Sequence, residues 1–306
     1  MLRKLIIIAG PTAVGKTSLA ITVASEVGGQ IISADSRQIY RYMEVATAKP
    51  NAAERAAVEH HGLDLRDPDE PYSAGEFSRY ARDRVREMWR QDLIPVVVGG
   101  TGLYLQALLD GLWRETVSAQ TLRDDLKARL STQGVEGLHH ELGHLDAVAQ
   151  SRIAATDTQR VLRALELAHL GIRGAGHGWD PLPCVPVAFC LNRTREQLYR
   201  RIDQRVEAMV AQGLIAEVEQ LLDKGYTRST RAMQSLGYED LLDHLDGVCS
   251  LDAALAKMRL RTRQYAKRQL TWFRKDRRFR WLDLDRWGSA GGVERVLAEI
   301  RNRRGL

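Results

Sequence analysis

The sequence contains little cysteine, and this scarcity excludes several kinds of protein. Its three cysteines, Cys184, Cys190 and Cys249, show no C-x-x-C spacing. A disulfide scaffold and a four-cysteine zinc site are therefore both disfavoured, because each needs more cysteines at closer spacing. Free thiols of this kind are typical of buried positions in a protein from a reducing compartment.

Long apolar runs are also missing. No stretch approaches the roughly 20 apolar residues that a helix needs to span a bilayer. The N-terminal segment Met1–Ile8 resembles a signal peptide for a few residues, but its apolar run is too short and Gly10–Thr17 follows where a cleavage site should be. We therefore expect a cytoplasmic protein that does not enter the membrane.

Excess charge of one sign is scarce outside a single segment. The chain has 45 Lys and Arg against 39 Asp and Glu, a net charge of +6. The segment Arg259–Arg280 holds ten cations and one acid, so it carries +9 and the rest of the chain sums to −3. Met258, Tyr265 and Trp272 lie seven residues apart, so one helical stripe can pack on the body while the cations face outward. Such a helix indicates contact with nucleic-acid phosphates.

Short apolar runs, by contrast, recur along the 306 residues and predict buried strands of a parallel sheet. These runs are Leu5–Ala9, Ile31–Ala34, Leu93–Val98 and Val185–Leu191, and the mixed segment Arg280–Leu284 is a candidate for a last strand. A helical pattern at Lys16–Val27 separates the first run from the second, and another at residues 74–91 separates the second from the third. The alternation predicts an α/β fold with a P-loop NTPase-like parallel sheet flanked by helices. Ligands of such sheets bind at the carboxyl ends of the strands.

The middle of the chain has a different texture, which predicts a second domain. Residues 114–183 are polar and helical, and they close with a glycine- and proline-rich stretch at 171–183. We interpret them as a helical insertion domain between two core strands. The core then consists of residues 1–113 and 184–306, with the basic helices at its C-terminal end.

The strongest motif follows the first strand directly. It matches G-x-x-x-x-G-K-[ST] in full, with residues Gly10, Pro11, Thr12, Ala13, Val14, Gly15, Lys16 and Thr17. Backbone N–H groups of such a loop surround phosphate oxygens, and the following helix N-terminus adds positive potential. Lys16 supplies a charge, and the Thr17 hydroxyl is a ligand for Mg²⁺. The motif predicts binding of a polyphosphate, but it does not distinguish ATP or GTP from another pyrophosphate.

The acid that usually accompanies this loop in energy-coupling ATPases is absent from its expected place. The strand Leu93–Val98 ends in Gly99, Gly100 and Thr101, with no carboxylate to hold the metal. Asp35 does end a strand, but the polar residues Ser36–Gln38 follow it, and these suit recognition of a base edge. The pattern therefore favours a group transferase that uses the loop to hold a leaving pyrophosphate.

These segments together resemble the tRNA dimethylallyltransferase family. Beyond the phosphate loop, the resemblance depends on Ile32–Tyr40, Thr47–Pro50, Gly99–Tyr104, Asp157–Glu166 and Thr262–Arg274. The Asp-Ser-Arg-Gln and Thr-Arg-Gln-Tyr-Ala-Lys-Arg-Gln stretches are the most specific of them. The resemblance runs from the first strand to the last basic helix, which is nearly the whole chain.

The resemblance implies transfer of a dimethylallyl group from dimethylallyl diphosphate to N6 of the adenosine 3′-adjacent to the anticodon. An exocyclic adenine amine is a weak nucleophile and needs a base, for which Asp35 is the candidate. The phosphate loop and Mg²⁺ would stabilise the departing diphosphate. Thr101 would supply a hydroxyl, and Arg205 would reach the diphosphate from across the site.

The implied partner is the tRNA anticodon stem-loop, whose target base must be splayed out of the loop. The resemblance assigns tRNA contacts to Asp35, Ser36, Arg37, Gln38, Thr101, Arg123, Gln159, Arg160, Val161, Leu162 and Arg163. The basic helix adds Lys267, Arg268, Gln269, Thr271, Trp272 and Arg274. One RNA per chain favours a monomer, and no obligate protein partner is indicated.

Other functions remain open on the sequence alone. A nucleoside or small-molecule kinase uses the same phosphate loop, although the missing acid and the basic helix argue against it. An enzyme that prenylates free AMP would need neither the insertion nor the basic helix. An RNA-binding regulator could retain the pocket without chemistry, but it would not need Asp35, Lys16 and Thr17 intact.

Overall fold

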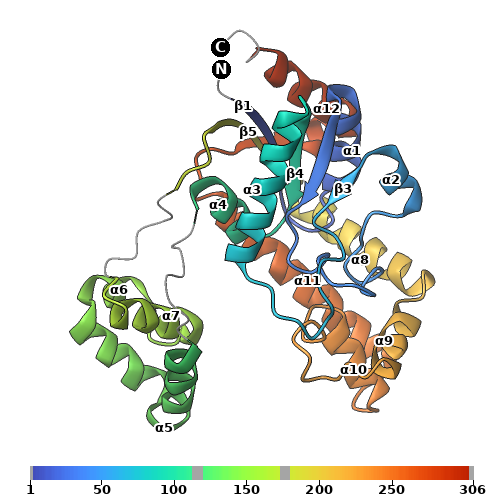
Figure 1. Ribbon diagram of the computed structural model, residues 1–306. Coiled ribbons are helices and arrows are strands. Elements are labelled where there is room, and N and C mark those ends of the chain that lie inside the picture. Colours follow the sequence, from blue (N-terminus) through green and yellow to red (C-terminus); the bar gives the residue numbers. More distant parts are fainter. Residues whose placement is uncertain (1–2, 112–119, 173–179, 303–306) are drawn as a thin grey trace. The chain divides into compact units, whose positions relative to one another are not determined.

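The computed structural model describes residues 3–111, 120–172 and 180–302 (Figure 1). The chain divides into two compact units, residues 1–109 with 181–306 and residues 110–180. These boundaries fall a few residues before the expected 113/114 and 183/184. The expected boundary at 113/114 and most of the glycine-rich stretch at 171–183 lie outside the described residues.

The first unit is built on a sheet whose strands are all parallel. In chain order, the described strands are β1 (Arg3–Ala9), β2 (Gly29–Ser33), β3 (His60–His61), β4 (Ile94–Gly99), β5 (Cys184–Asn192) and β6 (Arg280–Asp283). Their spatial order is β3-β2-β4-β1-β5-β6. The predicted fold class and the five predicted strands are confirmed. The two-residue strand β3 was missed, because His60–His61 carries no apolar pattern.

Helices cover both faces of this sheet because β1 alternates its buried side chains between two cores. Leu5 and Ile7 pack in one core with α3 (Ala74–Arg90) and α4 (Gly102–Asp110). Ile6 and Ile8 pack in the other with α1 (Lys16–Val27) and α12 (Leu284–Asn302). Figure 1 shows α3 in front of the sheet, with α1 and α12 beyond it.

Local signals account for where the helices begin. The phosphate loop passes into α1 at Gly15, which has φ 107°, a conformation that a residue with a Cβ rarely adopts. Reciprocal side-chain bonds between Ser73 and Glu76 form a capping box at the start of α3. The Ser250 side chain accepts from Ala253 N at the start of α11, which spans Leu251–Phe273.

Four helices gather at the carboxyl end of the sheet and complete the first unit (Figure 1). They are α8 (Arg195–Ala211), α9 (Leu214–Asp223), α10 (Tyr238–Leu245) and α11. The short helix α2 (Ala52–Ala57) follows β2. No helix in the described ranges is both long and apolar enough to cross a membrane.

The second unit is helical in its described part and has a core of its own. It contains α5 (Gln120–Leu145), α6 (Ala147–Arg152) and α7 (Thr158–His169). Its buried residues include Leu126, Leu138, Leu142, Val161 and Leu165. Residues 3–111, 120–172 and 180–302 hold no group of three or more His, Cys, Asp or Glu side chains that could bind a metal ion.

Candidate active site

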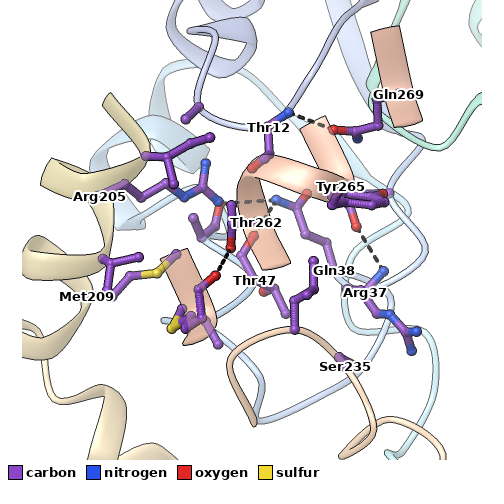
Figure 2. A pocket seen from close by; sticks show the side chains of 18 of the residues that line it. Thr12, Arg37, Gln38, Thr47, Arg205, Met209, Ser235, Thr262, Tyr265 and Gln269 are labelled. Atoms are coloured by element: carbon purple, nitrogen blue, oxygen red, sulfur yellow. Dashed lines mark hydrogen bonds between the residues drawn. The ribbon is translucent and has the colours of Figure 1, made fainter. Parts of the chain in front are cut away.

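The carboxyl ends of β1, β2 and β4 open into one cavity of about 910 Å³. Thr12, Lys16 and Thr17 line it from the phosphate loop, and Asp35 lines it from the end of β2. Arg205 reaches it from α8. Figure 2 shows Arg205 and Met209 on one wall of this cavity and Tyr265 and Gln269 on the other. The structure therefore brings together side chains that the sequence places far apart.

The carbonyls of the phosphate loop accept hydrogen bonds from its own lysine and from two arginines elsewhere in the chain. The Lys16 ammonium donates to the carbonyls of Gly10 and Pro11, at 3.0 and 2.8 Å. Arg201 Nε donates to Ala13 O at 2.7 Å, and Arg193 Nε donates to Val14 O at 3.1 Å. These two arginines were not predicted as site residues, because nothing in their sequence spacing links them to the loop.

Three charges share the inner part of the cavity. Burial, and to a lesser degree the Arg205 charge, lowers the pKa of Lys16 to about 8, while Asp35 acts in the opposite direction. Burial also lowers the pKa of Arg205, again against the influence of Asp35. Lys16, Arg205 and Asp35 thus lie close enough to interact electrostatically, and the two cations can bind a diphosphate between them.

Asp35 lies at the start of a tight turn, and a backbone N–H of this turn orients its carboxylate. Arg37 N donates to Asp35 Oδ1 at 2.9 Å. Across the described chain, Oδ2 receives no hydrogen bond from the protein. The carboxylate therefore has one anchored oxygen and one that is able to accept a proton from a ligand.

Gln38 is bonded at both ends of its side-chain amide. Ser33 Oγ donates to Gln38 Oε1 at 2.8 Å, and Gln38 Nε2 donates to the carbonyls of Thr47 and Ala48, at 3.2 and 3.0 Å. Although Gln38 lines the cavity, its donors and one acceptor position are already occupied. Its role in this conformation is to hold the turn after β2 against the loop at 47–48.

Thr101 supports the turn rather than the cavity wall. Its Oγ1 accepts a hydrogen bond from Ser36 N at 3.1 Å. Burial raises the pKa of Tyr265 to about 12, and this phenol is hydrogen-bonded to Thr101. Thr101 is not among the described residues that line the cavity. Its hydroxyl therefore acts on the site through Ser36.

Gln269 is buried, with 6% of its surface exposed, and it does not face outward as an RNA contact requires. Thr12 N donates to Gln269 Oε1 at 2.8 Å, and Gln269 Nε2 donates to Gly100 O at 3.0 Å (Figure 2). A Cβ at Gly100 would lie 2.1 Å from Gln269, and one at Gly102 would lie 2.2 Å from Trp272. These glycines let α11 sit directly on the loop after β4, and Gln269 ties that helix to the phosphate loop.

The basic segment is less free than the sequence suggests, because half of its ten cations pair with carboxylates. Arg263 reaches Asp203 at 2.7 Å and Arg261 reaches Glu239 at 2.6 Å. The remaining pairs are Arg259 with Glu207, Arg278 with Asp276, and Arg280 with Glu299. The sequence did not reveal these ion pairs, because their carboxylates, apart from Asp276, lie outside the basic segment.

The other five cations form an exposed surface that we call the α11 basic face. It consists of Lys267, Arg268, Arg274, Lys275 and Arg277, for which the described chain provides no ion pair. A depression of about 410 Å³ lies on this face, lined by three of these cations together with Thr271 and Trp272. The residue Trp272 is 37% exposed.

In the second unit, the predicted RNA contacts divide into exposed and engaged groups. Gln159 and Arg160 are exposed at the start of α7, whereas Val161 is fully buried in the core of that unit. Arg123 and Arg163 both bind the Glu166 carboxylate, which is 4% exposed. Leu162 is partly buried. The Val161 side chain is therefore unable to contact RNA.

A parallel sheet with a complete phosphate loop at its carboxyl edge places the protein among the P-loop enzymes. Its family is more specific. The IPP transferase family matches residues 38–276, and the chain belongs to this family. It is an enzyme of the prenyltransferase class.

Curated relatives match almost the whole chain. The tRNA dimethylallyltransferase of Syntrophobacter fumaroxidans is 42% identical over 98% of this chain and 89% of its own length. That of Geobacillus thermodenitrificans is 41% identical over 93% of this chain and 91% of its own length. The resemblance predicted from the motifs is thus confirmed.

Solved structures agree with this assignment. The tRNA isopentenylpyrophosphate transferase of Bacillus halodurans has a TM-score of 0.70 and 36% identity, covering 98% of this chain and 99% of its own. A eukaryotic dimethylallyltransferase acting on tRNA has a TM-score of 0.74 and 27% identity, covering 93% of this chain and 75% of its own.

Proposed function

We propose that the protein transfers a dimethylallyl group from dimethylallyl diphosphate to N6 of the adenosine 3′-adjacent to the tRNA anticodon. The observation that carries this proposal is the single cavity that the phosphate loop, Asp35 and α11 share. Family membership and the names of the relatives support the same reaction.

The phosphate loop and the cations beside it bind the diphosphate. Lys16 and Arg205 stabilise the charge that develops as the allylic C–O bond breaks. The new bond forms between that carbon and N6, and the proton on N6 passes to the Asp35 carboxylate. Diphosphate leaves with the electron pair of the broken bond.

The apolar part of the cavity suits the five-carbon chain. Met209, Leu236 and Met258 line it. These side chains are apolar, and methionine adapts to an irregular hydrocarbon. The sequence did not assign them to the site, because they come from α8, α11 and the loop before α10 and share no spacing.

A divalent cation fits the phosphate loop only with help from the substrate. Thr17 lines the cavity and its hydroxyl is a suitable Mg²⁺ ligand, but no cluster of three metal-binding side chains exists within residues 3–111, 120–172 and 180–302. Such a donor set matches Mg²⁺ held mainly by phosphate oxygens and water, as is common for this ion. When bound, the ion neutralises charge on the departing diphosphate.

The α11 basic face would bind the tRNA. Its cations suit phosphates, and the half-exposed Trp272 ring offers a surface on which a base can stack. From the second unit, the exposed Gln159 and Arg160 would contribute polar contacts to the anticodon loop. Arg123 and Arg163 both donate to Glu166, so their role would be to hold α7 in place and not to contact bases directly.

The test is label transfer. Purified protein with Mg²⁺ and labelled dimethylallyl diphosphate is incubated with unmodified tRNA, with AMP, or with neither. We expect label in the tRNA alone, at the adenosine next to the anticodon. Label in AMP would favour a free-nucleotide prenyltransferase, and ATP consumption without label transfer would favour a kinase.

A further inference from the structure

The loop between β2 and α2 forms part of the cavity wall without any regular secondary structure. Ala46, Thr47 and Ala48 line the cavity, and the backbone of residues 41–48 consists of turns and irregular chain. Tyr42 and Ala48 have positive φ angles of 66° and 45°. Residues with a Cβ avoid this conformation, so neighbouring groups must hold the loop in place.

A buried carboxylate on α9 supplies much of that hold. Glu217, 8% exposed, accepts hydrogen bonds from three consecutive backbone N–H groups. The distances are 2.7 Å from Glu44 N, 2.6 Å from Val45 N and 3.1 Å from Ala46 N. Successive N–H groups that converge in this way form an anion-binding concavity. Here the anion is part of the protein itself.

A phenol completes the arrangement. Tyr238, fully buried at the start of α10, donates from its hydroxyl to Glu217 Oε1 at 2.6 Å. Burial and the neighbouring carboxylate raise the pKa of Tyr238 well above its usual value, so it remains a donor. Glu217 thus receives four hydrogen bonds, and α9 and α10 meet the loop at one carboxylate.

The loop is hydrogen-bonded to the turn after β2, which contains Asp35 and Gln38. Its carbonyls at Thr47 and Ala48 accept both hydrogen bonds of the Gln38 amide. Gln38 Oε1 in turn accepts a hydrogen bond from Ser33 Oγ, so the Gln38 side chain connects the loop at 47–48 to the end of β2, two residues before Asp35. A displacement of residues 44–48 therefore removes the acceptors of both Gln38 Nε2 hydrogen bonds, while Ser33 and Thr101 still bond the turn.

We propose that Glu217 is a positioning residue for the transfer reaction. It touches no reacting atom. It holds residues 44–48 in a strained shape, and through Gln38 it sets the place of Asp35 relative to the acceptor base. The inference rests on the proposed function, because it assigns Glu217 to the same reaction.

The test compares two neighbouring carboxylates on α9. Glu217→Gln replaces an acceptor oxygen with an amide that offers donors to the loop N–H groups, whereas Glu219→Gln makes the same change at an exposed position. We expect Glu217→Gln to lower kcat for transfer by about 10²-fold, as a displaced catalytic group does. The Kd for inorganic pyrophosphate should change less than about twofold, because no bond of Glu217 reaches the phosphate loop. Glu219→Gln should match the wild type in both.

Amide hydrogen exchange gives a readout that is independent of activity. In Glu217→Gln, protection of the amides of residues 44–46 should be lost while the sheet retains its own. Wild-type kcat with wild-type protection would overturn the proposal. A parallel loss of kcat, pyrophosphate binding and thermal stability would also overturn it, because Glu217 would then serve the fold as a whole.

A second variant keeps the proposal testable if Glu217→Gln does not fold. Tyr238→Phe preserves the carboxylate and removes one of its four donors. We expect a smaller fall in kcat with the same unchanged pyrophosphate affinity, and unchanged kcat would contradict the role. If the wild type transfers no label to tRNA, the proposed function fails, but the exchange pattern still shows whether Glu217 orders the loop.

Discussion

At the scale of single residues, the charge on Lys16 depends on its surroundings. Burial and Arg205 place its pKa at about 8, below the ordinary value of 10.5. In the ligand-free protein, Lys16 therefore loses its proton in a range where an exposed lysine remains charged. A bound diphosphate favours the protonated form, because an adjacent anion raises the pKa of an ammonium group.

Pyrophosphate binding should consequently weaken as the pH rises through about 8. Above this pH the ligand must bring a proton back to Lys16, so its Kd should rise by up to about tenfold per pH unit. Calorimetry at pH 7 to 9, in buffers with different ionisation enthalpies, would measure both the Kd and the proton uptake. Lys16→Arg stays charged throughout, and its Kd should show no such dependence. A flat profile for the wild type would contradict the lowered pKa.

Asp35 has a different task, which predicts loss of chemistry without loss of binding. Asp35→Ala removes the proton acceptor, and we expect kcat to fall by about 10²- to 10⁴-fold. tRNA affinity, measured by filter binding, should stay close to that of the wild type. Asp223→Ala, at an exposed position on α9, is the matched control. Turnover similar to the wild type in Asp35→Ala would eliminate the carboxylate as the base.

At the scale of elements, helix α11 has two functional faces. Tyr265 and Gln269 pack toward the cavity and the loop at 100–102, whereas the α11 basic face lies in solvent. Cations that are already paired with carboxylates release few counterions when RNA binds. Only the unpaired cations should therefore contribute strongly to the salt dependence of binding.

Removal of two unpaired cations should weaken tRNA binding and flatten its dependence on salt. For Lys267→Ala with Arg268→Ala, we expect the slope of log K against log salt to fall by about 1.4 to 1.8, from 0.7 to 0.9 per lost phosphate contact. Arg280→Gln removes a cation of the same segment that is engaged with Glu299, and should leave the slope unchanged. Equal slopes for all three proteins would argue against RNA contact at this face.

The elements themselves show how far sequence patterns reach. Buried parallel strands are unbroken apolar runs, so β1, β4 and β5 were predicted to within one or two residues. The helix Lys16–Val27 was predicted with its correct ends, because the phosphate loop precedes it and a glycine in the left-handed region, Gly28, ends it. Local chemistry determines such elements, and local chemistry is visible in the sequence.

Contacts between distant segments were not visible in this way. Gln269 lies among cations in the sequence and was assigned to RNA. In the structure it is buried, because the missing Cβ of Gly100 leaves room for its side chain. Val161 lies in a motif of polar residues, yet it falls on the inner side of α7. Glu217 gave no signal, since the amides that it binds are 171 to 173 residues away. Helix phase and tertiary packing decide these positions.

At the scale of the whole molecule, the second unit is inserted where the chain of the first unit comes back on itself. Leu182 N donates to Leu109 O at 2.8 Å, so the two connections of the insertion start side by side. Each unit has its own hydrophobic core. Insertions of this kind occur where few contacts cross the boundary.

The first unit should therefore fold without the second. Replacement of residues 112–179 by a short Gly-Ser linker should leave a cooperative thermal transition and pyrophosphate binding within about twofold of the full chain. Transfer to tRNA should be lost if the insertion contacts the anticodon loop. Calorimetry, pyrophosphate titration and the label assay test these three outcomes. Normal transfer by the shortened protein would remove the insertion from substrate recognition.

The bond between Thr12 and Gln269 also determines when during synthesis the site can form. It joins residues 257 positions apart, so it closes one of the longest loops in the chain. At about 5–20 residues per second, a ribosome makes the phosphate loop roughly 13 to 50 seconds before it makes Gln269. During that time the nascent chain contains all eight residues of the phosphate motif. The helix α11, whose Gln269 bonds the loop, has not yet been made. A product truncated before α11 would thus keep the signature of the enzyme without its finished site.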